Sequence, residues 1–110
     1  MSLILRSDFG CTEAVIDDDC GLKRFYEVAE ILDRDLHISF TKKLDDFDSV
    51  IWEFKYRELD LTLHYNIYTG ISIYPSNCSE AMKKENNAVI SVAKYLESKL
   101  MVNQTKEFFQ

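Results

Sequence analysis

Residues 48–75, DSVIWEFKYRELDLTLHYNIYTGISIYP, decide the fold of this chain through the spacing of their apolar side chains. From Val50 to Arg57 apolar residues alternate with mostly charged ones, and the alternation resumes from Leu61 to Tyr68. A period of two is typical of β-strands that bury one face and leave the other in water. The stretch therefore predicts successive antiparallel strands that share one apolar face.

The register of the first hairpin follows from this alternation. A two-residue turn at Glu58-Leu59 places every apolar residue of one strand opposite an apolar residue of the other. A slip of one residue would place each of them opposite a polar residue, so the pattern favours this register. The predicted pairs are Tyr56 with Leu61, Phe54 with Leu63, Trp52 with Tyr65, Val50 with Ile67, and, on the polar face, Glu53 with His64.

Gly70 marks the second turn. We expect Tyr68, Thr69 and Gly70 to form a three-residue loop, because glycine tolerates the left-handed conformation that such a loop requires. Proline is suited to the end of a strand, so the strand after this loop is expected to end at Pro75. The predicted pairs are Ile67 with Ile71 and Tyr65 with Ile73, with Tyr74 opposite His64.

The other segments complete an α+β fold. A third alternation predicts a strand over residues 36–41, and the charged residues 42–48 predict a loop from which Leu44 and Phe47 turn inward. The stretches 3–8 and 12–16 predict one or two further strands. Helical spacing of apolar residues predicts two helices, at about 21–34 and 79–99. We therefore expect a single α+β domain, residues 1–110, with an antiparallel β-meander sheet of about 4–6 strands and both helices packed on one face.

The net charge limits the classes of partner. The chain has 19 acidic and 13 basic residues, a formal charge of −6. This charge repels phosphate backbones, and no stripe of Lys or Arg is available to bind them, so we expect no nucleic acid. No apolar run approaches the length of a membrane span, so we expect no membrane. An acidic surface suits a basic protein instead.

The three cysteines, Cys11, Cys20 and Cys78, form no C-x-x-C pair, and the first residues lack the pattern of a signal peptide. We therefore expect three reduced thiols in a cytoplasmic protein. If the protein is exported by a route other than the signal-peptide pathway, a Cys11–Cys20 disulfide is the alternative.

Few residues are arranged for catalysis. Glu53 beside His64 could act as an acid–base pair, but neither a third orienting group nor a nucleophile motif accompanies them. His37 and His64 match no zinc spacing, and the three glycines are too scattered for a phosphate loop. We expect no metal, no cofactor and no enzymatic activity, and a small enzyme that uses Glu53 and His64 is kept as an alternative.

Acidic clusters and tyrosines on the polar face predict a surface that binds a partner, since tyrosine is enriched at protein interfaces. A nuclease presents a cationic cleft to phosphate, so an acidic inhibitor would find it quickly. We therefore expect a small bacterial immunity protein that binds and neutralises a basic toxin, in the leading version a nuclease. An acidic dimeric secretion chaperone is a second alternative, and a homodimer is left open. The expected partner-binding residues are Asp45, Asp46, Asp48, Glu53, Glu58, Asp60, His64, Tyr68 and Tyr74.

Overall fold

The computed structural model describes residues 3–8, 10–18 and 20–109, with side chains for all of these except 8 and 101–109. The elements follow the chain as β1 (Ile4–Asp8), β2 (Cys11–Asp17), α1 (Leu22–Leu36), β3 (Phe40–Asp45), β4 (Ser49–Tyr56), β5 (Leu59–Asn66), β6 (Gly70–Pro75), the 3-10 turn η1 (Cys78–Glu80) and α2 (Lys83–Phe109). The strands form one antiparallel sheet in the order β1-β2-β6-β5-β4-β3. The α+β fold with an antiparallel sheet of six strands and two helices confirms the prediction.

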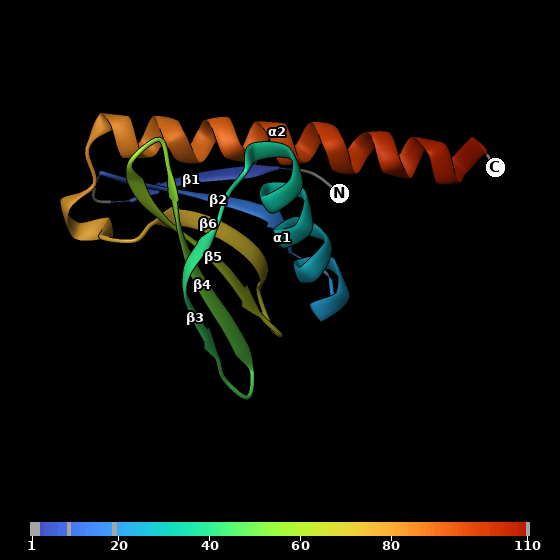
Figure 1. The fold of residues 1–110 in the computed structure, drawn as a ribbon, viewed down its shortest axis with the longest axis horizontal. Helices are drawn as coiled ribbons and strands as arrows, with labels where there is room; N and C mark the ends of the chain where they lie inside the picture. The colour runs from blue at the N-terminus through green and yellow to red at the C-terminus, as the bar shows by residue number, and fades with distance from the viewer. Residues whose placement is uncertain (1–2, 9, 19, 110) are drawn as a thin grey trace.

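Both helices lie on the same face of the sheet, α2 along β2, β6 and β5, and α1 toward β4 (Figure 1). The ring of Phe25 in α1 lies edge-on to Trp52, with 4.9 Å between centroids. The alternate residues of the central strands point into this layer, as expected from their period of two. Fully buried members of the core are Ala14, Ile16, Phe25, Val28, Leu32, Phe54, Leu61, Leu63, Ile71, Ile73, Val89, Val92, Ala93 and Leu96.

The β4–β5 hairpin keeps the predicted parity but is shifted by two residues. Its turn is Arg57-Glu58, not Glu58-Leu59, and both turn residues have positive φ, 52° and 67°. Consequently Trp52 pairs with Leu63 rather than Tyr65. Alternation cannot distinguish two registers that differ by two residues, because both keep the same face apolar. The observed pairs are Tyr56 with Leu59, Phe54 with Leu61, Trp52 with Leu63, Val50 with Tyr65, Ile51 with His64 and Glu53 with Thr62.

The β5–β6 hairpin is shifted in the same way. Its three loop residues are 67–69, and Gly70 follows them at φ 81° and pairs with Asn66. Gly70 does have the left-handed conformation that was predicted. Ile67, which was expected in the core, lies in the loop instead and is 50% exposed. The observed pairs are Tyr65 with Ile71, Leu63 with Ile73, His64 with Ser72 and Thr62 with Tyr74.

The segment between α1 and β4 also differs from the prediction. The expected strand at 36–41 is mostly absent, because α1 continues to Leu36 and ends at His37 in the left-handed conformation. The expected loop at 42–48 instead supplies most of β3, an edge strand that pairs with β4. Helical and strand periods overlap in this short stretch, so Leu36 and Ile38 fit either pattern. The second helix begins later than predicted, at Lys83, and continues to Phe109.

Two of the three cysteines form a disulfide, which corrects the expectation of three reduced thiols. Cys11 at the start of β2 is joined to Cys78 at the start of η1, with 5.4 Å between their Cα atoms. Their separation of 67 residues kept this pairing from being predicted, since only the packing of β2 against the chain after β6 brings them together. Cys20 lies outside the bridge.

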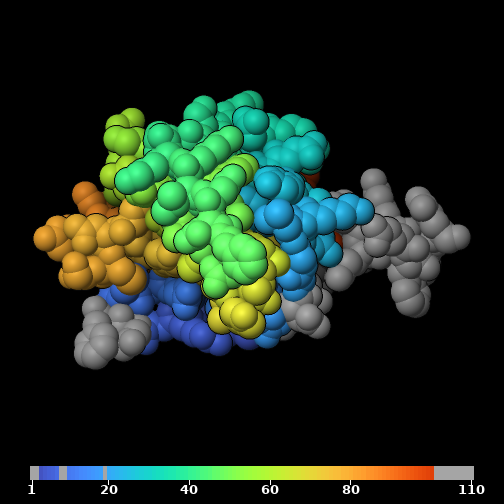
Figure 2. Space-filling view, turned by 90° about the horizontal axis from the view of Figure 1, so that it is seen from below, coloured from blue at the N-terminus to red at the C-terminus, as the bar shows by residue number. Residues whose placement is uncertain are grey.

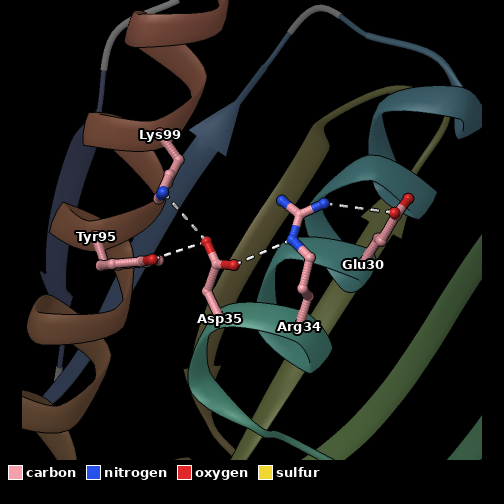
Figure 3. A network of polar contacts seen from close by, with 5 residues as sticks. All are labelled: Glu30, Arg34, Asp35, Tyr95 and Lys99. Carbon is pink, nitrogen blue, oxygen red and sulfur yellow. Dashed lines mark hydrogen bonds and ion pairs between the residues drawn. The ribbon is translucent and has the colours of Figure 1, made fainter.

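A polar network joins the end of α1 to α2 (Figure 3). The Tyr95 hydroxyl donates a hydrogen bond of 2.7 Å to Asp35, and Lys99 Nζ lies 3.5 Å from the same carboxylate oxygen. Arg34 Nε donates to the other oxygen at 3.1 Å, and Arg34 also pairs with Glu30. The hydrogen bonds from Tyr95 and then Arg34 lower the pKa of Asp35, and the bond to Asp35 raises the pKa of Tyr95. The network fixes where α2 lies relative to α1.

Candidate functional site

The structure distributes the nine predicted partner-binding residues over three places on the sheet. The first group lies in the loops at one end of the strands, the second on the face away from the helices, and the third at the opposite end. In this order the groups are Asp45, Asp46, Asp48 and Tyr68; Glu53, His64 and Tyr74; and Glu58 and Asp60.

The first group belongs to a surface that we call the loop tip, residues 44–49 and 66–70. The β3–β4 and β5–β6 loops lie side by side there, because Ile67 N donates a hydrogen bond of 3.1 Å to the Asp48 carbonyl. Each loop is also fixed by its own polar groups. Phe47 N donates to Asp46 Oδ1 at 2.7 Å, and Tyr68 N donates to Asn66 Oδ1 at 2.8 Å. These bonds hold the backbone of the tip in a defined conformation.

Two aromatic rings of the loop tip are exposed. Phe47 is 98% exposed and Tyr68 is 79% exposed. The prediction that Leu44 and Phe47 turn inward is therefore wrong, since Leu44 is also 56% exposed. Figure 2 looks at this end of the molecule and shows the green β3–β4 segment beside the yellow residues near 70 on the surface. Single exposed apolar residues are common, but several on two adjoining loops form a patch of the kind that binds partners.

The loop tip is acidic as well as aromatic. Its residues include Asp45, Asp46 and Asp48, but no Lys, Arg or His. Asp45 Oδ1 accepts a hydrogen bond of 2.9 Å from Trp52 Nε1, which ties the end of β3 to the core. The neighbouring basic residue Lys43 is held over the Trp52 ring, with 4.3 Å from Nζ to the centroid. The charge around the two exposed rings is therefore negative.

The second group lies on the sheet face opposite the helices. Tyr74 Oη and His64 Nδ1 form a hydrogen bond of 3.2 Å. Both side chains are half-buried, and burial lowers the pKa of His64 and raises that of Tyr74. The predicted pairing of Glu53 with His64 does not occur, because Glu53 is opposite Thr62 and lies 4.0 Å from Lys42 Nζ. This face does not bring the expected acid–base pair together.

A stripe in which four of six residues are apolar crosses the same face and was not predicted. Successive cross-strand partners run from edge to edge of the sheet: Ile4, Val15, Ser72, His64, Ile51 and Leu44. Val15 is only 5% exposed although it points away from the helices. The buried Thr62 beside this stripe shares a hydrogen bond of 2.8 Å with Ser76. This face is therefore buried at Val15 and Thr62 rather than fully solvated.

The third group lies at the far end of the strands, where a depression of about 290 Å³ opens between the β4–β5 turn and the start of α2. Four carboxylates and one lysine line it, so it too is acidic. Glu80 already accepts a hydrogen bond from Asn77, and Glu85 accepts one from the Met82 N–H. The lining residues are Glu58, Leu59, Asp60, Pro75, Asn77, Glu80, Lys84 and Glu85.

Other kinds of site have no support in the described part of the chain. Among the residues whose side chains the structure describes, no three His, Cys, Asp or Glu gather as metal ligands would. Within residues 3–8, 10–18 and 20–109, no helix has both the length and the apolar character needed to cross a membrane. Comparison of the chain with protein-family models, with curated proteins and with solved structures finds no match.

The residue that sequence reasoning missed at the loop tip is Phe47. The sequence feature that could have indicated its exposure is its position between two acids, Asp46-Phe47-Asp48. Phe47 has no apolar residue next to it in the chain that would be buried with it. Tyr68 was expected at the start of the loop before the last strand and on the exposed side of the sheet, and the structure places it in that loop, exposed.

Proposed function

We propose that the chain is a non-enzymatic protein-binding protein that binds and neutralises a basic partner. In the leading version it is a bacterial immunity protein and the partner is a toxin. A nuclease is the favoured kind of toxin, because it must present cationic groups to phosphate. The observation that supports the proposal is the loop tip, where two exposed aromatic rings stand among three aspartates.

Exposed aromatic rings and carboxylates contribute to binding in different ways. Phe47 and Tyr68 offer large apolar areas at little cost in side-chain entropy, and such residues often dominate the binding energy of an interface. The surrounding carboxylates would speed the encounter with a cationic surface and select against acidic proteins. Because the loop backbones are already hydrogen-bonded, little order has to be gained on binding.

The other predicted binding residues have secondary roles in this proposal. β4 is eight residues long, about 26 Å at ~3.3 Å per residue, and it separates the loop tip from Glu58 and Asp60. A partner seated on the loop tip would therefore reach Glu53, His64 and Tyr74 on the sheet face before those two residues. We place the main contact at the loop tip.

The location of the protein is part of the proposal. A cytoplasmic protein with three reduced thiols was predicted, and the Cys11–Cys78 disulfide contradicts the expected thiols. Disulfides persist mainly in oxidising compartments. The cytoplasmic location therefore stays a prediction, to be tested by the redox state of Cys11 and Cys78 in the cell.

The proposal is tested with the protein encoded beside this chain in its genome. The two proteins are co-expressed and cell growth is measured, and the affinity of the purified pair is measured between about 50 and 200 mM salt. We expect rescue of growth and an affinity that falls as salt rises. A neighbour that is not toxic and does not bind, or binding that does not respond to salt, contradicts the proposal.

Variants then locate the contact. Asp45→Asn, Asp46→Asn and Asp48→Asn together keep the hydrogen-bond acceptors but remove three charges, and should slow association about tenfold at low salt. Phe47→Ala should weaken binding about 30-fold, the effect of losing about 2 kcal/mol at an interface anchor. The matched control is Glu30→Gln, Asp33→Asn and Glu97→Gln, which removes three charges from the helices. If the control weakens binding equally, net charge rather than the loop tip is responsible.

A further inference from the structure

The segment between β6 and α2, residues 77–82, is held to the rest of the molecule in an unusual way. Residues 77–80 are all exposed, and η1 contains no buried residue. Apolar packing therefore contributes little to holding this segment in place.

The hydrogen bonds of the segment are local. Within it, Glu80 N donates to the Asn77 carbonyl at 3.1 Å and Ala81 N to the Cys78 carbonyl at 3.3 Å. The side chain of Asn77 bonds Glu80 and Ser79, and the Met82 N–H bonds Glu85 at the start of α2. None of these bonds reaches the sheet. The bond that does is the disulfide from Cys78 to Cys11, which lies in β2 and is 6% exposed.

The chain on both sides of the segment is held independently of the disulfide. Before it, Pro75 pairs with Leu61, and Ser76 N donates to the Asp60 carbonyl at 3.0 Å. After it, the Asn86 side chain donates to the Gly10 carbonyl at 2.7 Å and accepts from Thr12 N at 3.0 Å. Loss of the disulfide would therefore release residues 77–82 alone, between two fixed points.

We infer that the Cys11–Cys78 disulfide is a redox-controlled tether, which holds residues 77–82 against β2 when oxidised and frees them when reduced. The inference does not depend on the proposed function. It does reach the depression at that end of the sheet, because Asn77 and Glu80 belong to its lining together with Glu58 and Asp60. Release of the segment would remove these two residues from the lining.

The chemistry is an exchange with a dithiol reductant. A thiolate of the reductant attacks Sγ of Cys78, the exposed half of the bridge, and the sulfur–sulfur bond breaks with Cys11 leaving as a thiolate that takes up a proton. The second thiol of the reductant then attacks the mixed disulfide and releases Cys78. Two electrons pass from the dithiol, which becomes a cyclic disulfide, to the two protein sulfurs.

The test is hydrogen–deuterium exchange on the full chain, fully oxidised with glutathione disulfide or reduced with dithiothreitol. Cys20→Ser is used throughout, so that the bridge cysteines are the only thiols, and mass spectrometry after alkylation confirms each state. We expect amides 80–82 to exchange at least about tenfold faster in the reduced protein, at labelling times at which peptides from β5 and from residues 88–96 are still protected in both states. The Cys11→Ser, Cys78→Ser double variant should reproduce the reduced pattern without reductant.

Three results would overturn the inference. Equal protection of residues 80–82 in both states would show that the local hydrogen bonds suffice. Exchange of β5 and of residues 88–96 at those same labelling times in the reduced protein would show that the bridge holds the whole fold rather than this segment. Alkylation of both bridge cysteines after treatment with glutathione disulfide would show that they do not pair.

Discussion

Replacement of Gly70 by alanine should be among the most damaging single-methyl changes in this protein. Gly70 begins β6 at φ 81°, in the left-handed region that alanine adopts at a cost. A Cβ at this position would also lie 1.9 Å from the carbonyl oxygen of Asp17 and 2.7 Å from the Cα of Asp18. Both atoms belong to the backbone at the end of β2, so no side-chain rotation can relieve the contact.

The chain contains a matched control for this change. Gly10, in the β1–β2 turn, has φ 80°, but a Cβ there would meet no atom within 4 Å. Gly10→Ala therefore measures the conformational cost alone, about 1–2 kcal/mol. Gly70→Ala adds the displacement of β2 from β6, a steric cost of about 1–3 kcal/mol in packed interiors. We expect Gly70→Ala to lower the free energy of unfolding by about 2–5 kcal/mol in all.

The assay is equilibrium unfolding in urea, followed by the fluorescence of Trp52. This is the only tryptophan of the chain, and it is 9% exposed in the fold, so unfolding changes its surroundings. The difference between the two alanine variants isolates the steric cost, because the two glycines have nearly the same φ, 80° and 81°. If Gly70→Ala is no more destabilised than Gly10→Ala, within about 0.5 kcal/mol, the close approach of β2 to β6 at this point is refuted.

Three further predictions concern the turn, the half-buried histidine and the bridge. Arg57→Asn with Glu58→Gly should raise the free energy of unfolding by about 1–2 kcal/mol, because both positions have positive φ, which Asn and Gly adopt more readily than Arg and Glu. An unchanged urea midpoint would contradict the left-handed turn. Burial lowers the pKa of His64 in the folded protein below its ordinary value of 6.5, so the unfolded chain binds more protons as the pH falls past 6.5. The free energy of unfolding should therefore decrease as pH decreases through that value. His64→Gln should flatten this part of the plot of stability against pH. Cys11→Ser with Cys78→Ser should lower the free energy of unfolding by about 4 kcal/mol, because the bridge closes a loop over a separation of 67 residues in the unfolded chain. The variant should keep the native fluorescence of Trp52 in the absence of denaturant. A loss below about 1 kcal/mol would show that the bridge constrains the unfolded chain little.

The sheet could be predicted from sequence because its core residues alternate without interruption. Alternation decides which side of a strand is buried, and Trp52, Phe54, Leu61 and Leu63 are all in the core as expected. It does not decide where a hairpin turns, since a shift by two residues leaves each face unchanged. The turn at Arg57-Glu58 carries no glycine or asparagine to mark it, and Gly70 follows the second loop instead of being its last residue, so both predicted registers were wrong by two.

The candidate site was less predictable for a related reason. The predicted pairing of Glu53 with His64 depended on the register, and the shift separated them. Phe47 was predicted to turn inward from a long loop before β4. The charged stretch there instead forms the edge strand β3 and a tight turn, and Phe47 in that turn is exposed. The disulfide depended on contacts between distant segments, for which a single sequence carries no local signal.

The strand order implies an order of assembly. Strands β3 to β6 are joined by short hairpins, so each pairing closes a small loop and can form early. β2 pairs with residues 71–73 of β6, and that contact must wait until these residues have left the ribosome, although β2 is made first. Once β6 has emerged, its edge is open to other chains until β2 pairs with it, and because the β1–β2 hairpin is made first, a partner for that edge is already at hand.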